Sequence, residues 1–188
     1  ENRDDTDPDV VAYIQPIKTR WVKIGMPDSA KHVANQLRNL QDYLCGKLYK
    51  QGFLERPRKI STTMLLKAGK HLQVKYMQTK PQTPPQIFNL MTTQAMAMKV
   101  AHAILTVETQ GLVQFIDYAE RIEKDAKTKK KGSRANKWLS SNSDWKVALQ
   151  VAKSNKQDNP KLDRLSELID IQIQTGSSRF IVFAEIRH

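Results

Sequence analysis

Residue types that carry out catalysis or bind metals are few and scattered in this chain. The single cysteine, Cys45, has no second cysteine or histidine at metal-ligand spacing, which also fits a reducing compartment. The segment closest to a phosphate-binding loop is Gly69-Lys70, which lacks the upstream glycine and the following Ser or Thr. We therefore expect no catalytic, metal or cofactor site in this chain. The four histidines are His32, His71, His102 and His188.

His102 lies within the helix predicted over residues 86–110. It lies six residues before Glu108, so the two side chains point from different faces of that helix. Because the surrounding residues are mostly apolar, we interpret His102 as a satisfied polar residue of a helical core.

The cationic residues carry a stronger signal. The chain has 31 Lys and Arg against 19 Asp and Glu, a formal charge of +12, which favours a polyanionic partner such as nucleic acid or an anionic membrane surface. Residues 124–156 hold ten basic and two acidic residues, and a second basic tract runs from Arg56 to Lys80. The tract lacks a bulky apolar face, which disfavours a membrane helix. Such density binds phosphates by releasing counterions. The predicted phosphate contacts are Lys127, Lys129, Lys130, Lys131, Arg134, Lys137, Lys153, Lys156, Arg56, Arg58, Lys59, Lys67, Lys70 and Lys75.

Helices must position most of these cations. Residues 86–110 are apolar on nearly every side and predict a central helix surrounded by others, since three polar or charged residues interrupt the run too often for a membrane span. Periodic apolar residues predict further helices over about 28–51, 62–76, 112–126, 143–152 and 160–175. Gly46 inside the first of these costs about 1 kcal/mol relative to alanine. Residues 127–142 are basic and polar, and we predict a phosphate-contacting loop there; a solvated connector is the alternative.

Two short segments have strand character. Residues 19–24 alternate, and residues 180–183 form a continuous apolar run. A strand needs a partner sheet, so we expect both to join a sheet outside the helical part. The fold class predicted is mainly α, a helical bundle-like domain with short β-strand stubs at both ends.

The sequence also resembles a known family. Ala97, Lys99, His102, Ala103 and Leu105, followed by Glu108-Thr109-Gln110-Gly111, resemble the helical insertion of the archaeal Hef helicase-nucleases, relatives of the Fanconi anemia M helicases. The strand segment Arg179–Arg187 is similar to a strand of the same family, and Asn159-Pro160-Lys161 stands where the family usually has His-Pro-Lys.

The resemblance implies a domain organisation. Residues 1–26 would be an acidic arm and a strand stub of the second RecA-like motor domain, 27–158 the helical insertion, and 159–188 the returning helix and strand. The ATP-binding motor motifs and the XPF-type nuclease are missing from these residues, so no enzymatic activity is expected of the chain itself. ATP and magnesium would belong to the parent helicase.

The function implied is a thumb-like grip on forked or branched duplex DNA in a superfamily-2 helicase. The partners expected are this DNA and the RecA-like motor domains of the same parent chain, with no membrane. The location is cytoplasmic in an archaeon or nuclear in a eukaryote. Two alternatives stay open: a double-stranded RNA grip of a Dicer-like or RNA-sensing helicase, and a helical protein-interaction module whose basic face meets an acidic protein.

Overall fold

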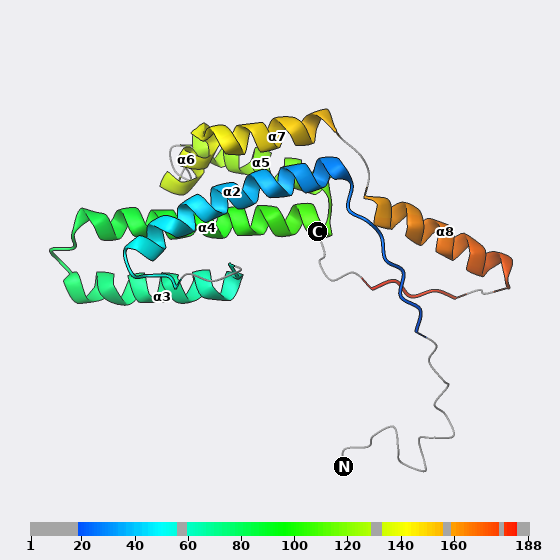
Figure 1. Cartoon of the computed structure of the whole chain (residues 1–188), viewed down its shortest axis with the longest axis horizontal. Helices are drawn as coiled ribbons and strands as arrows, with labels where there is room; N and C mark the ends of the chain where they lie inside the picture. The colour runs from blue at the N-terminus through cyan, green and yellow to red at the C-terminus, as the bar shows by residue number, and fades with distance from the viewer. Residues whose placement is uncertain (1–18, 56–59, 129–132, 156–158, 177–178, 184–188) are drawn as a thin grey trace, which may run out of the picture.

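The computed structural model describes residues 19–55, 60–128, 133–155, 159–176 and 179–183, and within them the chain forms helices and no strand (Figure 1). The helices are α2 (Asp28–Lys50), α3 (Thr62–Thr79), α4 (Pro85–Thr109), α5 (Leu112–Lys127), α6 (Arg134–Ser141), α7 (Ser143–Ser154) and α8 (Pro160–Gln174). The mainly helical prediction is confirmed. None of the described helices is long and apolar enough to cross a membrane.

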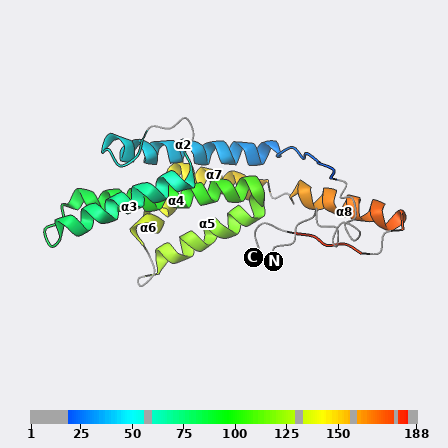
Figure 2. The ribbon, with the colours of Figure 1, turned by 90° about the horizontal axis from the view of Figure 1, so that it is seen from below.

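Helix α4 lies at the centre of the bundle, as its apolar surface predicted. It packs against α2, α3, α5 and α6, and Ala97, Val100 and Ala103 along it are fully buried. In Figure 1, α3 lies below α4 while α5, α6 and α7 lie above it, and Figure 2 shows α2 and α5 on opposite sides. A helix covered on so many sides has no continuous polar face, which explains its composition.

Helix α2 buries the stripe that its spacing predicted. Val33, Leu37, Leu40, Leu44 and Leu48 are all buried against α4 and α7. The helix continues through Gly46, where an added Cβ would meet nothing within 4 Å. The low helix propensity of glycine is therefore overridden by the packing of the stripe.

A short turn joins α4 to α5. Gly111 has φ 98° and ψ −172°, a conformation open essentially to glycine alone, and it precedes α5 directly. The chain therefore reverses direction, and α5 runs back obliquely to α4 (Figure 2), with Leu112, Phe115 and Ile116 buried.

Helix α6 corrects the predicted loop over residues 127–142. The Ser133 hydroxyl accepts a hydrogen bond from the Asn136 N–H at 3.1 Å and caps the helix, and Ala135, Asn136 and Leu139 bury one face of it. Two apolar residues and a cap sufficed because α4, α5 and α7 surround the helix. The N-cap of α7 is Asn142 and not Ser143 or Asp144, since the Asn142 amide oxygen accepts from the Trp145 N–H at 3.0 Å.

The predicted β-strand stubs are not found in the described residues. Residues 19–27 and 179–183 have no regular structure, because neither has a neighbouring strand to exchange backbone hydrogen bonds with. Trp21 is 87% exposed and Phe183 is 89% exposed. Both segments lie beside α8 at one end of the bundle (Figure 1).

Candidate nucleic-acid interface

The structure describes half of the predicted phosphate contacts. Lys127, Arg134, Lys137, Lys153, Lys67, Lys70 and Lys75 lie on described helices. The other seven, Arg56, Arg58, Lys59, Lys129, Lys130, Lys131 and Lys156, lie outside the described residues.

Four cations gather where α5 ends and α6 begins, and we call them the basic corner: Lys124, Lys127, Arg134 and Lys137. Lys124 and Lys127 occupy the last turn of α5, and Arg134 is the first residue of α6, which packs against α5. All four side chains are exposed, and none forms an ion pair with a carboxylate of the described residues. The corner thus presents positive charge that the fold leaves uncompensated.

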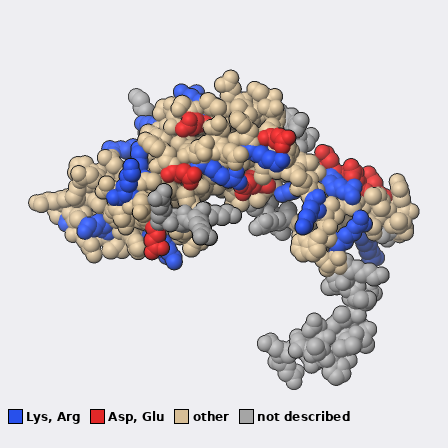
Figure 3. Space-filling model, in the orientation of Figure 1, with Lys and Arg blue, Asp and Glu red and all other residues tan. Residues whose placement is uncertain are grey.

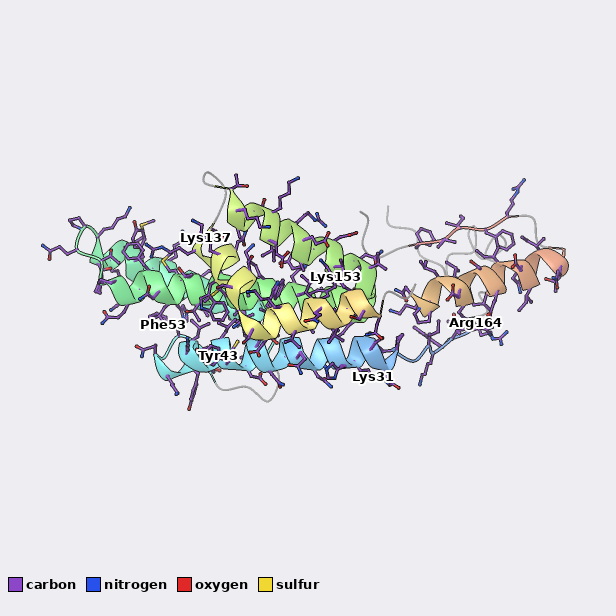
Figure 4. All side chains as sticks on the ribbon, turned by 90° about the horizontal axis from the view of Figure 1, so that it is seen from above. Lys31, Tyr43, Phe53, Lys137, Lys153 and Arg164 are labelled. Carbon is purple, nitrogen blue, oxygen red and sulfur yellow. The ribbon has the colours of Figure 1, made fainter. Side chains whose placement is uncertain are left out.

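Lys153 differs from the basic corner because a carboxylate already holds it. Its Nζ lies 2.8 Å from the Oε1 of Glu120 across the α5–α7 contact. This hydrogen bond, with the charges of Glu120 and Glu123, raises the pKa of Lys153 above its ordinary value. Figure 4 shows Lys153 toward the far end of α7 from Lys137. A phosphate at Lys153 would have to displace Glu120, which makes this lysine a weaker contact than the corner.

The remaining described candidates lie on α3. Leu65, Ala68 and Leu72 pack this helix against α4, which leaves Lys67, Lys70 and Lys75 exposed and without a carboxylate partner among the described residues. The sequence has no acidic residue from position 56 to 107. The outer surface of α3 is therefore a second positive region.

The two positive regions do not form one surface. Helix α3 lies below α4, whereas α5 and α6 lie above it (Figure 1). The face in Figure 3, which includes α2, shows acidic and basic side chains interspersed. One duplex phosphate track reaching the basic corner would therefore not follow α3 as well without wrapping around the bundle.

A wide groove between α2, α4 and the start of α3 offers phosphate no excess of positive charge. It has a volume of about 1130 Å³. Its lining holds the carboxylates of Asp42, Glu55 and Glu108 beside the cations of Arg38 and Lys50, and Glu108 is ion-paired with Arg38. Cys45 also lines it; burial, and then the charge of Asp42, raises the pKa of this thiol to about 12, so it stays protonated at neutral pH. The described residues contain no group of three metal-ligating side chains.

His102 is exposed and not part of the core, which corrects the sequence interpretation. Its ring contacts the edge of the Tyr118 ring, with centroids 4.7 Å apart, on the side where α5 packs against α4. Lys99 and Arg121 lie on the same two helices and were not among the predicted contacts. Lys99 is three residues from His102, and Arg121 is three residues from Tyr118, so each pair shares a helix face in the sequence pattern. The sequence pattern does not show that the two pairs meet, because their proximity depends on the turn at Gly111.

Comparison with known proteins matches the helical part of the chain. A family model described as "Putative ATP-dependent RNA helicase, helical bundle" matches residues 29–159, from the first turn of α2 to the residue before α8. The chain is also similar to the crystal structure of the Hef helicase domain from Pyrococcus furiosus, with a TM-score of 0.70 and 29% identity. That similarity covers 92% of this chain and 36% of the other. No curated protein sequence matches.

Proposed function

Because this chain belongs to the family of ATP-dependent RNA helicase helical bundles, we propose that it is the nucleic-acid-binding insertion of a superfamily-2 helicase. The likeness to the Hef helicase domain over most of this chain supports a position inside a helicase. The chain spans about a third of that structure. We therefore assign motor activity to the proposed parent helicase and not to this chain.

The observation that carries nucleic-acid binding is the uncompensated charge of the basic corner. A lysine or arginine that stabilises the fold is expected to form an ion pair with a carboxylate, as Arg38 and Lys153 do. The corner cations instead point to solvent from two packed helices. Such groups contact phosphates and supply affinity without sequence preference.

We propose forked or branched duplex DNA as the ligand. The similarity to the Hef helicase domain supports this choice, since the resemblance in sequence implied that substrate. Double-stranded RNA is the second candidate, because the description of the family names an RNA helicase. Phosphate contacts alone do not distinguish DNA from RNA, whereas contacts that depend on the groove geometry and the 2′-hydroxyl do.

The proposed protein partner is the RecA-like motor of the same parent chain. None of the residues of α8 is buried, and its apolar residues Leu162 and Ile173 are 58% and 54% exposed. Trp21 and Phe183 are also exposed, and each belongs to one of the two segments that lie beside this helix in Figure 1. A helix with exposed apolar residues and two segments with exposed apolar residues at one end of a bundle form a surface that another domain would cover. ATP and magnesium would bind to that motor.

Fluorescence anisotropy with labelled forked DNA, linear duplex DNA and double-stranded RNA tests the proposal. Replacing Lys127 and Lys137 with alanine should weaken binding, and the slope of log affinity against log salt should fall by about 1.8 on duplex DNA if both contact phosphates. A matched control replaces Lys31 and Arg164, which also removes two charges but from cations that are ion-paired.

The outcomes separate the candidates. Tighter binding of the fork than of equal-length RNA supports the DNA proposal, and the reverse order supports the RNA candidate. An equal loss of affinity in the control variant would mean that net charge, and not the basic corner, governs binding. Absence of binding to every nucleic acid at low salt would overturn the function.

A further inference from the structure

A second group of cations lies where α4 and α5 pack together. Lys99 and His102 are one turn apart on α4, and Tyr118 and Arg121 are one turn apart on α5. The chain reverses at Gly111, so these two turns lie against each other. Lys99 is half-buried, while His102 and Arg121 are exposed.

Tyr118 holds this group in place. Its ring packs edge-on against His102, and its hydroxyl donates a hydrogen bond to the backbone carbonyl of Lys99 at 3.3 Å. Burial raises the pKa of Tyr118 to about 12, so the phenol remains a neutral donor. The imidazole is therefore restricted to one side of the helix pair, next to two cations.

The charges around His102 have the same sign. Partial desolvation of the exposed ring, where it contacts Tyr118, lowers the pKa of His102, and the charges of Arg121 and Lys99 lower it further. Asp117 and Asp125 lie one turn on either side of Arg121 along α5, but neither is within ion-pair distance of Lys99, His102 or Arg121. Lys99 and Arg121 lie beside His102 with no ion pair to a described carboxylate, which is an arrangement that a bound anion would stabilise.

We propose that Lys99, His102 and Arg121 form a binding site for a backbone phosphate of nucleic acid, an inference that rests on the proposed function. The site lies next to the basic corner along α5, because Lys124 and Lys127 follow Arg121 within two helical turns. The six steps from Arg121 to Lys127 span roughly 9 Å along the helix axis. That length is close to the rise of about three phosphates of one strand along the duplex axis, at about 3.4 Å each.

The test follows the His102 imidazole by NMR in the whole chain with histidine labelled. Its pH titration is recorded alone, with short duplex DNA, with duplex RNA and with inorganic phosphate. A bound phosphate favours the imidazolium, so the pKa of His102 should rise on addition of the duplex that binds. The signal of His32, which lies on α2, is the reference and should not move.

A charge variant gives the second readout. Replacing Lys99 and Arg121 with alanine should abolish the response of His102 and reduce the salt slope on duplex DNA by about 1.8. The Tyr118 hydrogen bond goes to a backbone carbonyl, so it survives this change, and circular dichroism checks the fold. The control is the double replacement of Lys31 and Arg164 with alanine.

Each outcome decides. A response to duplex and not to inorganic phosphate supports a site that reads a polymer backbone; a response to both supports the phosphate site without that restriction. Duplex binding with an unmoved His102 signal and an unchanged salt slope in the Lys99 and Arg121 variant overturns the site and leaves the proposed function standing. No duplex binding at low salt overturns both.

Discussion

Two helical glycines should respond oppositely to alanine. Gly46 in α2 and Gly69 in α3 are both inside helices, and helix propensity alone predicts that alanine stabilises each by about 1 kcal/mol. The surroundings differ. An added Cβ at Gly46 meets nothing within 4 Å, whereas at Gly69 it would lie 2.9 Å from the Nε2 of Gln94.

The cost at Gly69 comes from what Gln94 is doing. Its amide donates a hydrogen bond to the backbone carbonyl of Leu65 at 3.0 Å and so links α4 to α3. Alanine would push this amide away, losing a hydrogen bond of about 1 kcal/mol and forcing a side-chain torsion at about 0.5–1.5 kcal/mol. We therefore expect Gly46→Ala to stabilise by about 1 kcal/mol, and Gly69→Ala to destabilise by about 0.5–1.5 kcal/mol once the propensity gain is subtracted from these two costs.

Urea unfolding followed by circular dichroism at the helical band measures the difference. The midpoint should rise for Gly46→Ala with an unchanged m-value, and its melting temperature should increase by about 2–4 °C. Gln94→Ala combined with Gly69→Ala is the control, because alanine at Gly69 then no longer meets the Gln94 amide. Equal stabilisation by both single variants would refute the reasoning from Gln94.

Three further predictions follow from particular residues. Gly111→Ala should destabilise the chain by about 1–3 kcal/mol in urea, because alanine is strained at this φ and ψ; an unchanged midpoint would mean that the turn can relax. Because the pKa of His102 is lowered from its ordinary value of 6.5 in the folded chain, the unfolded chain binds the proton more readily. The contribution of neutral His102 to the stability of the folded chain is complete above about pH 6.5 and is lost as the pH falls below that value. His102→Gln should therefore flatten the decline of melting temperature between about pH 7 and 5. The purified chain should hydrolyse no ATP with or without DNA, because its sequence has no phosphate loop; turnover above a buffer blank in a coupled assay would contradict this.

The helices were predictable where an apolar stripe and a terminating residue agree. Val33 to Leu48 repeat at helical spacing, and Asn159-Pro160 starts α8 as the cap rule predicts. Helix α6 was not predictable in the same way, because its eight residues bury little and depend on three neighbouring helices. The predicted strands are absent from the described residues because an alternating or apolar segment forms a strand only when a neighbouring strand supplies backbone hydrogen bonds.

The candidate interface was partly predictable. Charge density along the sequence pointed to Lys127, Arg134 and Lys137, which the fold leaves exposed together. It did not reveal that Glu120 already binds Lys153, since 33 positions separate the two in sequence. Nor did it bring Arg121 to Lys99, because the proximity of these residues depends on the reversal at Gly111.

The direction of α8 depends on a small polar junction. Asn159 caps α8 through its amide oxygen, and its amide nitrogen donates to the carbonyl of Thr109 at the end of α4, where the Lys161 ammonium also donates. Helix α8 has 15 residues and extends roughly 22 Å from this junction. Because the helix is held at one end by the Asn159 amide, a rotation of about 10° at Asn159 moves the far end of α8 by about 4 Å. A change of about 10° in the way Asn159 is held against the end of α4 would therefore shift the last turn of α8 by a distance close to the helical rise of about three residues.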